Sequence, residues 1–164
     1  MSGMHPARAM LMLATMLLTA ASGQTGERRL TAAQALALPV VPAGPGTSKL
    51  GAIETRLLKG DPSGPGLYTI SIRVPPNTRI AAHTHRDDRT AVVARGVWHF
   101  GYGPVAARGE SRALPAGSFY TEPAGDAHFA WTGKEGATVY ITGQGPSDTR
   151  YISDADNPRT GPGK

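Results

Sequence analysis

The chain contains no cysteine. That absence excludes disulfide frameworks, zinc sites with cysteine ligands and thiol nucleophiles. Methionine is confined to the first sixteen residues, so the chain from residue 24 onward offers no oxidisable sulfur. Such a composition suits an oxidising compartment or a metal that handles oxygen, and chance explains it nearly as well.

Charged and aromatic residues are scarce, at 18% and 6% of the chain, whereas apolar residues make up 40%. This balance is too apolar for a disordered chain. Glycine (21 residues) and proline (14 residues) are frequent, which is typical of short strands joined by tight turns. A length of 164 residues suits one domain with one core.

The net charge of +5 is spread along the chain. Arg28 and Arg29 are adjacent, but no stripe of lysine and arginine alternates with aromatic residues. Binding to nucleic acid needs a concentrated basic face. The sequence therefore predicts a mildly basic, solvated surface and no nucleic-acid partner.

The apolar run over residues 9–22 is shorter than the ~20 residues that a membrane-spanning helix needs. It follows a short segment with His5, Arg8 and no acidic residue, and small residues at 20–23 offer a cleavage site. This is the pattern of a secretory signal peptide. We predict a signal peptide over residues 1–23 and export, periplasmic or secreted, with no stable membrane span after cleavage. An uncleaved anchor or a buried helix is the alternative.

The rest of the chain divides into three parts. Residues 24–49 are predicted to form an extended lead-in with one short helix over 31–38, capped by Thr31. Residues 50–150 consist of short apolar runs bounded by turn residues, which is typical of an all-β sandwich or barrel. Residues 151–164 are predicted to form a flexible tail. The expected strands are 52–58, 67–74, 79–85, 89–94, 97–102, 117–121, 128–131 and 137–142.

Four histidines follow the predicted signal peptide: His83, His85, His99 and His128. His83 and His85 are two apart on an expected strand, so both side chains project from one face with Cα atoms ~7 Å apart. That spacing lets two imidazoles converge on one metal ion. A third nitrogen, from His128 on a neighbouring strand, would complete the set and leave positions open for water, oxygen or substrate.

Two motifs around these histidines resemble the signatures of the cupin superfamily. The first, usually G-x5-H-x-H-x3/4-E-x6-G, is here Asn77-x5-His83-Thr-His85-x3-Arg89-x6-Gly96. The second, usually G-x5-P-x-G-x2-H-x3-N, is here Gly117-x5-Pro123-Ala-Gly125-x2-His128-x3-Thr132. Seven of the ten fixed positions agree, and the likeness covers about residues 50–145.

The resemblance implies a cupin-type antiparallel β-barrel, also described as a double-stranded β-helix or jelly roll. It implies one divalent metal ion, of Fe, Mn, Ni, Cu or Zn, held by His83, His85 and His128. A homodimer is also expected, because many cupins dimerise.

The most important departure from these signatures is Arg89. It replaces a glutamate that is the fourth metal ligand in many cupins, and a guanidinium cannot ligate a cation. In one interpretation Arg89 points into the barrel and contacts an anionic group of a substrate. In the other the site has decayed, and Arg89 turns outward to pair with Asp87 or Glu122. Asn77 is a mild change, because asparagine tolerates the left-handed backbone that glycine supplies.

The expected strand over 97–102 alternates in side-chain direction. Trp98, Phe100 and Tyr102 share one face and are predicted to line an apolar pocket in the barrel, with His99 on the outer face. Ordinary core packing is the more common role of such aromatic side chains.

The resemblance implies a metal enzyme of the oxygenase, isomerase or lyase type. With the predicted signal peptide and with Arg89 as the anion contact, the leading hypothesis is an exported enzyme that acts on a small organic anion. The alternative is a non-catalytic barrel that captures a small ligand, with or without metal. A sensor that pairs with another exported protein is a third hypothesis.

Overall fold

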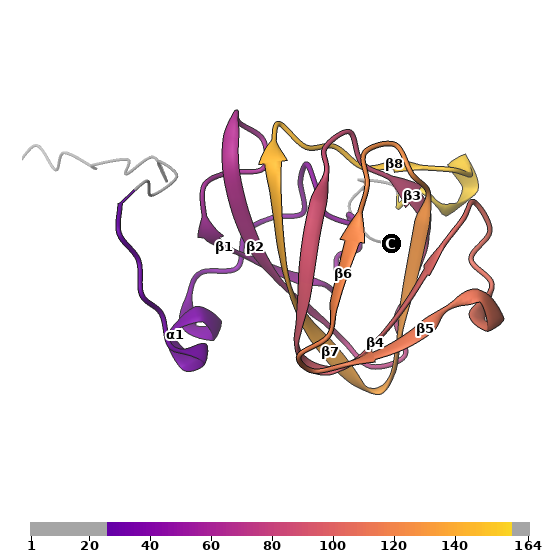
Figure 1. Cartoon of the computed structure of the whole chain (residues 1–164), viewed down its shortest axis with the longest axis horizontal. Helices are drawn as coiled ribbons and strands as arrows, with labels where there is room; N and C mark the ends of the chain where they lie inside the picture. Colours follow the sequence, from indigo (N-terminus) through magenta and orange to yellow (C-terminus); the bar gives the residue numbers. More distant parts are fainter. Residues whose placement is uncertain (1–25, 159–164) are drawn as a thin grey trace, which may run out of the picture.

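The computed structural model describes residues 26–158, so the predicted signal peptide lies outside the described residues (Figure 1). No helix within 26–158 is long and apolar enough to cross a membrane. This part of the chain contains the helix α1 (Ala32–Ala37) and eight strands. The strands are β1 (Glu54–Lys59), β2 (Gly66–Val74), β3 (Arg79–Thr84), β4 (Arg89–Tyr102), β5 (Arg112–Pro115), β6 (Phe119–Glu122), β7 (His128–Gly145) and β8 (Arg150–Tyr151).

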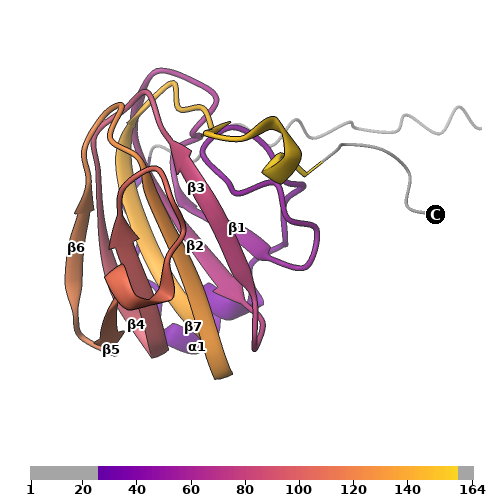
Figure 2. The same cartoon turned by 90° about the vertical axis from the view of Figure 1, so that its right-hand side faces the viewer.

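Strand β7 organises the sheet, in which all strand pairs are antiparallel. Its first half pairs with β3 and with the end of β4, and its second half pairs with β2 and with the start of β4. Strands β5 and β6 extend the other edge of β4, while β1 and β8 extend β2 and β3. The result is one bent sheet of jelly-roll type with β5 and β6 facing β1 and β3 (Figure 2). The all-β expectation is confirmed, although the sheet is not closed into a complete barrel within the described residues.

The core lies inside the bend of the sheet. Along β2 the side chains of Tyr68, Ile70, Ile72 and Val74 are buried, whereas Leu67 and Arg73 are exposed. This alternation follows from the two-residue period of a strand. Burial of each large apolar side chain stabilises the fold by about 1.5–3 kcal/mol.

Two glycines that were expected to separate strands instead bend them. Gly96 lies inside β4 with φ of 77°, and Gly136 lies inside β7 with φ of 69°. The register of β4 against β7 shifts on both sides of this position, which is the signature of β-bulges. The strands predicted over 89–94 and 97–102 are therefore one strand, as are those over 128–131 and 137–142.

Both ends of the described chain are tied to the sheet. The predicted helix is confirmed, because the Thr31 side chain caps α1 in a capping box with Gln34. The predicted flexible tail differs from the structure at its start. Tyr151 belongs to β8, which pairs with β3, and the amide of Ile152 donates to the carbonyl of Ala82 at 3.0 Å.

The bulge at Gly96 yields a test of the fold. A Cβ atom at Gly96 would lie 2.2 Å from the carbonyl oxygen of Gly136, at a left-handed φ. We expect Gly96→Ala to lower the free energy of unfolding by at least about 2 kcal/mol in urea titrations. Gly133→Ala is the matched control, because a Cβ atom there meets nothing within 4 Å. It should change the stability by less than about 1 kcal/mol, and equal effects of the two variants would contradict this explanation.

Candidate metal centre

The sheet brings together the three histidines of the two sequence motifs. His83 on β3 lies opposite His128 on β7, and His85 follows the end of β3. The ring centroids are 4.5 Å apart for His83 and His128, and 4.9 and 5.2 Å apart for the pairs that include His85. One nitrogen from each ring lies within 4.8 Å of the others, and all three side chains are buried.

Backbone carbonyls fix which nitrogen of each imidazole carries the proton. The Nδ1 atom of His83 lies 2.7 Å from the carbonyl oxygen of Ala81, and that of His128 lies 3.1 Å from the carbonyl oxygen of Asp126. The Nδ1 atom of His85 contacts the carbonyl oxygen of Asp148. A carbonyl only accepts hydrogen bonds, so each Nδ1 donates and each Nε2 keeps its lone pair.

The Nε2 atoms face a buried space. Those of His85 and His128 are fully buried and have no hydrogen-bond partner among residues 26–158. A buried nitrogen without a partner loses its hydration without compensation, so such atoms call for an explanation. A metal ion bound by the lone pairs would supply one.

Burial also keeps these imidazoles neutral. It lowers the pKa of His83 to about 3, with the nearby His128 as a further cause. Burial, assisted by the positive charge of Arg89, lowers the pKa of His85 to about 2. Burial lowers the pKa of His128 as well. Neutral imidazoles with Nδ1 bound to a carbonyl are the form in which histidines ligate metal ions, so the three residues fit a divalent metal.

Arg89 lies inside the bend of the sheet and is paired there. Its Nε and Nη2 atoms both donate to Oε2 of Glu122, at 2.5 Å from Nε, and its Nη1 atom donates to the carbonyl oxygen of Gly46 at 2.7 Å. Arg89 points into the bend of the sheet, as expected if it contacts a substrate. It also pairs with Glu122, as expected if the site has decayed. Asp87, the other partner considered, instead accepts from Tyr68 at 2.8 Å and from Ser147 at 2.6 Å.

The ion pair of Arg89 and Glu122 is buried on both sides. Burial alone would raise the pKa of Glu122, but the guanidinium of Arg89 holds that pKa at about 2. The carboxylate in turn raises the pKa of Arg89 despite its burial. Both groups therefore stay charged, and the sequence motifs gave no sign that Glu122 belongs to the site.

The aromatic residues of β4 divide between the cavity and the surface. Trp98 and Phe100 are buried and line the cavity beside the histidines, together with Tyr120 of β6. The prediction for Tyr102 is wrong. This last residue of β4 lies at the rim with 53% of its surface exposed, and its hydroxyl donates to the carbonyl oxygen of Thr121 at 2.8 Å. His99 lies on the outer face as expected and stacks on Trp131 at 3.5 Å.

The lead-in closes the open end of this cavity, a role that its composition did not indicate. Besides the bond from Arg89 to Gly46, the carbonyl oxygen of Thr47 accepts from the hydroxyl of Thr149 at 2.7 Å. The carbonyl oxygen of Ser48 accepts from the hydroxyl of Tyr151 at 2.5 Å. The cavity has a volume of about 30 Å³, enough for about one water molecule.

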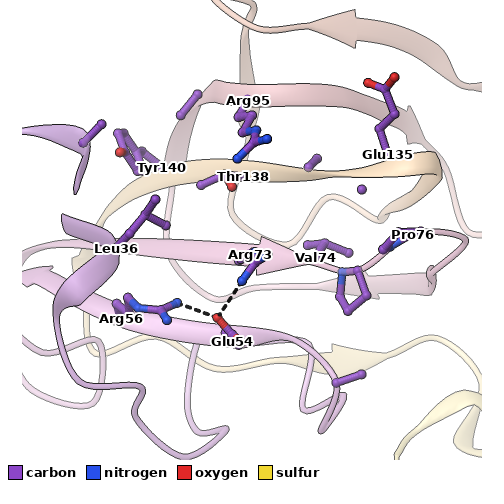
Figure 3. A pocket seen from close by; sticks show the side chains of 16 residues that line it. Leu36, Glu54, Arg56, Arg73, Val74, Pro76, Arg95, Glu135, Thr138 and Tyr140 are labelled. Atoms are coloured by element: carbon purple, nitrogen blue, oxygen red, sulfur yellow. Dashed lines mark hydrogen bonds and ion pairs between the residues drawn. The ribbon is translucent and has the colours of Figure 1, made fainter. Parts of the chain in front are cut away.

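A second cavity, of about 700 Å³, lies between α1 and strands β1, β2 and β7 (Figure 3). Arg56 and Arg73 both pair with Oε2 of Glu54 in it, at 2.9 and 3.7 Å. Its lining includes none of the three clustered histidines. The three-histidine group therefore lies in the small cavity inside the sheet.

No protein-family model matches the sequence, and no protein of curated function matches it. Solved structures do match the fold. The polyketide cyclase RemF from Streptomyces resistomycificus superposes with a TM-score of 0.63 at 17% identity, over 81% of this chain and 90% of that chain. An RmlC-like cupin from Shewanella frigidimarina gives a TM-score of 0.54 at 18% identity, over 73% and 91% of the two chains. A sugar phosphate isomerase of the cupin superfamily from Silicibacter pomeroyi gives 0.51 at 16% identity, over 71% and 75%.

The burial of neutral histidines predicts a stability that depends on pH. The unfolded chain takes up protons on histidine below about pH 6.5, whereas the folded pKa values of His83 and His85 are about 3 and 2. Stability is therefore complete above pH 6.5 and is lost as the pH falls below it. We expect the metal-free protein to lose roughly 1–2 kcal/mol of unfolding free energy per buried histidine between pH 7 and 5.

Urea titrations in the presence of a chelator would measure this loss. His85→Gln should reduce the loss, and His99→Gln should change it much less because His99 lies outside the cavity. Carboxyl groups stay mostly ionised in this pH range. Equal stability at pH 7 and pH 5 would contradict the burial of neutral imidazoles.

Proposed function

Because the chain has the cupin fold, we propose that it is an exported mononuclear metal enzyme acting on a small organic anion. Its metal would be one divalent ion of Fe, Mn, Ni, Cu or Zn, held by His83, His85 and His128. The observation that carries this proposal is the convergence of three buried imidazoles, two of which present partnerless Nε2 atoms. In a metal site such atoms ligate the ion, whereas without a partner their burial destabilises the fold.

A metal ion with open positions would supply Lewis-acid or oxygen-activating chemistry when bound. The protein's own contribution is to orient the ligands in a buried cavity. The carbonyls of Ala81, Asp126 and Asp148 orient the three imidazoles, and Trp98, Phe100 and Tyr120 line the space beside them. Burial strengthens the charge interactions with a bound substrate.

One feature supports an anionic substrate. The guanidinium of Arg89 has five N–H groups, of which three are used on Glu122 and Gly46. Tyr68 also interacts with this guanidinium, so its capacity for an anionic group is at most the two remaining N–H groups. The cyclase and the isomerase among the similar folds are enzymes by name, which favours an enzyme of the oxygenase, isomerase or lyase type here.

A non-catalytic cupin that binds a small ligand is the alternative function. The small volume of the cavity favours it, because a substrate larger than about one water molecule enters only if residues 46–48 shift. The two functions differ in one property. An enzyme needs metal with exchangeable positions, whereas a binder does not.

The partner of the proposed enzyme is a small molecule rather than nucleic acid or a membrane. A homodimer is part of the same proposal.

Metal content tests the proposed function directly. We expect wild-type protein purified from its native compartment to contain about one equivalent of metal per chain by elemental mass spectrometry. His83→Ala/His128→Ala should contain none, whereas His99→Ala should match the wild type because His99 lies outside the cavity. Iron or copper would favour oxygenation, and zinc would favour isomerisation. A folded wild type without metal would overturn the proposal.

Export has its own test, independent of the metal. Small residues at 20–23 place the expected mature N-terminus at Gly23 or Gln24. N-terminal sequencing of the protein from the extracytoplasmic fraction of its host should find one of these residues. A protein that keeps Met1 and stays in the cytoplasm would contradict export.

A further inference from the structure

A carboxylate lies beside the histidine cluster although Arg89 occupies the position of the usual glutamate. Oε2 of Glu122 lies 3.6 Å from Nε2 of His128 and 3.8 Å from Nε2 of His85. Glu122 is 3% exposed and lies at the end of β6. The carboxylate thus reaches the same space that the two partnerless imidazole nitrogens face.

The strand register explains how a carboxylate reaches this place. Arg89 on β4 and Glu122 on β6 are direct antiparallel partners, and the Cβ atoms of such partners lie about 4.5–5.5 Å apart. A glutamate at position 122 can therefore bring its carboxylate to the histidines from the strand opposite the one that carries the usual glutamate. Arg89 neutralises that carboxylate by donating to Oε2, the same oxygen that lies nearest the two histidines.

The ion pair with Arg89 places the carboxylate oxygen but leaves the two imidazole nitrogens without a donor. The Nε2 atoms of His85 and His128 carry lone pairs, because their Nδ1 atoms donate to carbonyls. An ionised carboxylate also only accepts. Three electron-rich atoms therefore face each other in a buried space with no donor among them, and such atoms repel at low dielectric. A cation between them removes the repulsion.

We propose that Glu122 is the fourth protein ligand of the metal, with Arg89 as its counterion. This inference rests on the proposed metal site. Ligands of a tetrahedral zinc ion with bonds of about 2.0–2.2 Å lie about 3.3–3.6 Å apart. The separations of 3.6 and 3.8 Å from His128 and His85 need shifts of a few tenths of an ångström at most. Glu122 makes no such close contact with His83, so the carboxylate must also move toward that ring when the ion binds. In this proposal Glu122 replaces the usual glutamate ligand and Arg89 is its counterion, so Arg89 does not indicate that the metal site has been lost.

The test must separate a ligand from a counterion. Glu122→Gln alone would leave Arg89 buried and unpaired, so the comparison is made in an Arg89→Met background. Zinc affinities are measured by competition with a chelator, for variants whose folding is checked by circular dichroism. Arg89→Met should bind zinc within about tenfold of the wild type, because Glu122 and the histidines remain.

The second substitution then decides the role of Glu122. Arg89→Met/Glu122→Gln should bind zinc at least about 100-fold more weakly than Arg89→Met. Loss of a residue that only hydrogen-bonds to a ligand typically lowers metal affinity by about 10–100-fold, so a direct ligand is expected to reach or exceed that range. The matched control is Arg89→Met/Glu135→Gln, because Glu135 lines the cavity outside the sheet and should leave the affinity unchanged. An affinity of Arg89→Met/Glu122→Gln within about threefold of Arg89→Met would overturn the inference.

A crystal structure of the zinc-loaded wild type tests the inference without any substitution. An oxygen of Glu122 about 2.0–2.2 Å from the ion would support it. Zinc bound by the three histidines with Glu122 beyond about 3 Å would overturn it and leave the proposed function standing. A wild type that binds no zinc or other divalent metal would overturn both.

Discussion

Three hydrogen bonds to backbone carbonyls constrain the whole site. Because Ala81, Asp126 and Asp148 accept from Nδ1 of the three histidines, each imidazole is left with one free lone pair on Nε2. The antiparallel pairing of β3 with β7 places His83 opposite His128, and the same sheet buries all three rings. The site is therefore an oriented, buried set of electron donors before any ligand arrives, and preorganisation of this kind is what metal sites require.

The three neutral histidines share the interior of the sheet with one buried ion pair. The carboxylate of Glu122 and the guanidinium of Arg89 compensate each other in the lining of the cavity, and removal of one partner from a buried pair typically costs about 3–5 kcal/mol. The pair joins β4 to β6 and, through the carbonyl of Gly46, to the lead-in. One buried ion pair thus links the histidine cluster, the wall of the sheet and the segment that closes the cavity.

The sequence predicted the parts of this structure that depend on local periodicity. Alternation along β2 follows from side-chain direction, and the spacing of His83, His85 and His128 within two motifs located the cluster. Gly96 and Gly136 could not be distinguished from turn residues, because a bulge and a turn both use the left-handed backbone. The sequence named Glu122 as a possible partner of Arg89, but its place beside the histidines and the role of the carbonyls of residues 46–48 could not be predicted. Their roles depend on cross-strand register and on backbone contacts between residues 43 to 103 positions apart.

The central claim is that three neutral imidazoles bind one metal ion through Nε2. X-ray absorption spectroscopy on the metal that the wild type carries tests it most directly. The claim predicts a first shell of nitrogen and oxygen atoms, at about 2.0–2.2 Å if the metal is zinc, with the outer-shell scattering of three imidazole rings. A spectrum without imidazole scattering would mean that the metal lies elsewhere on the protein and would contradict the claim.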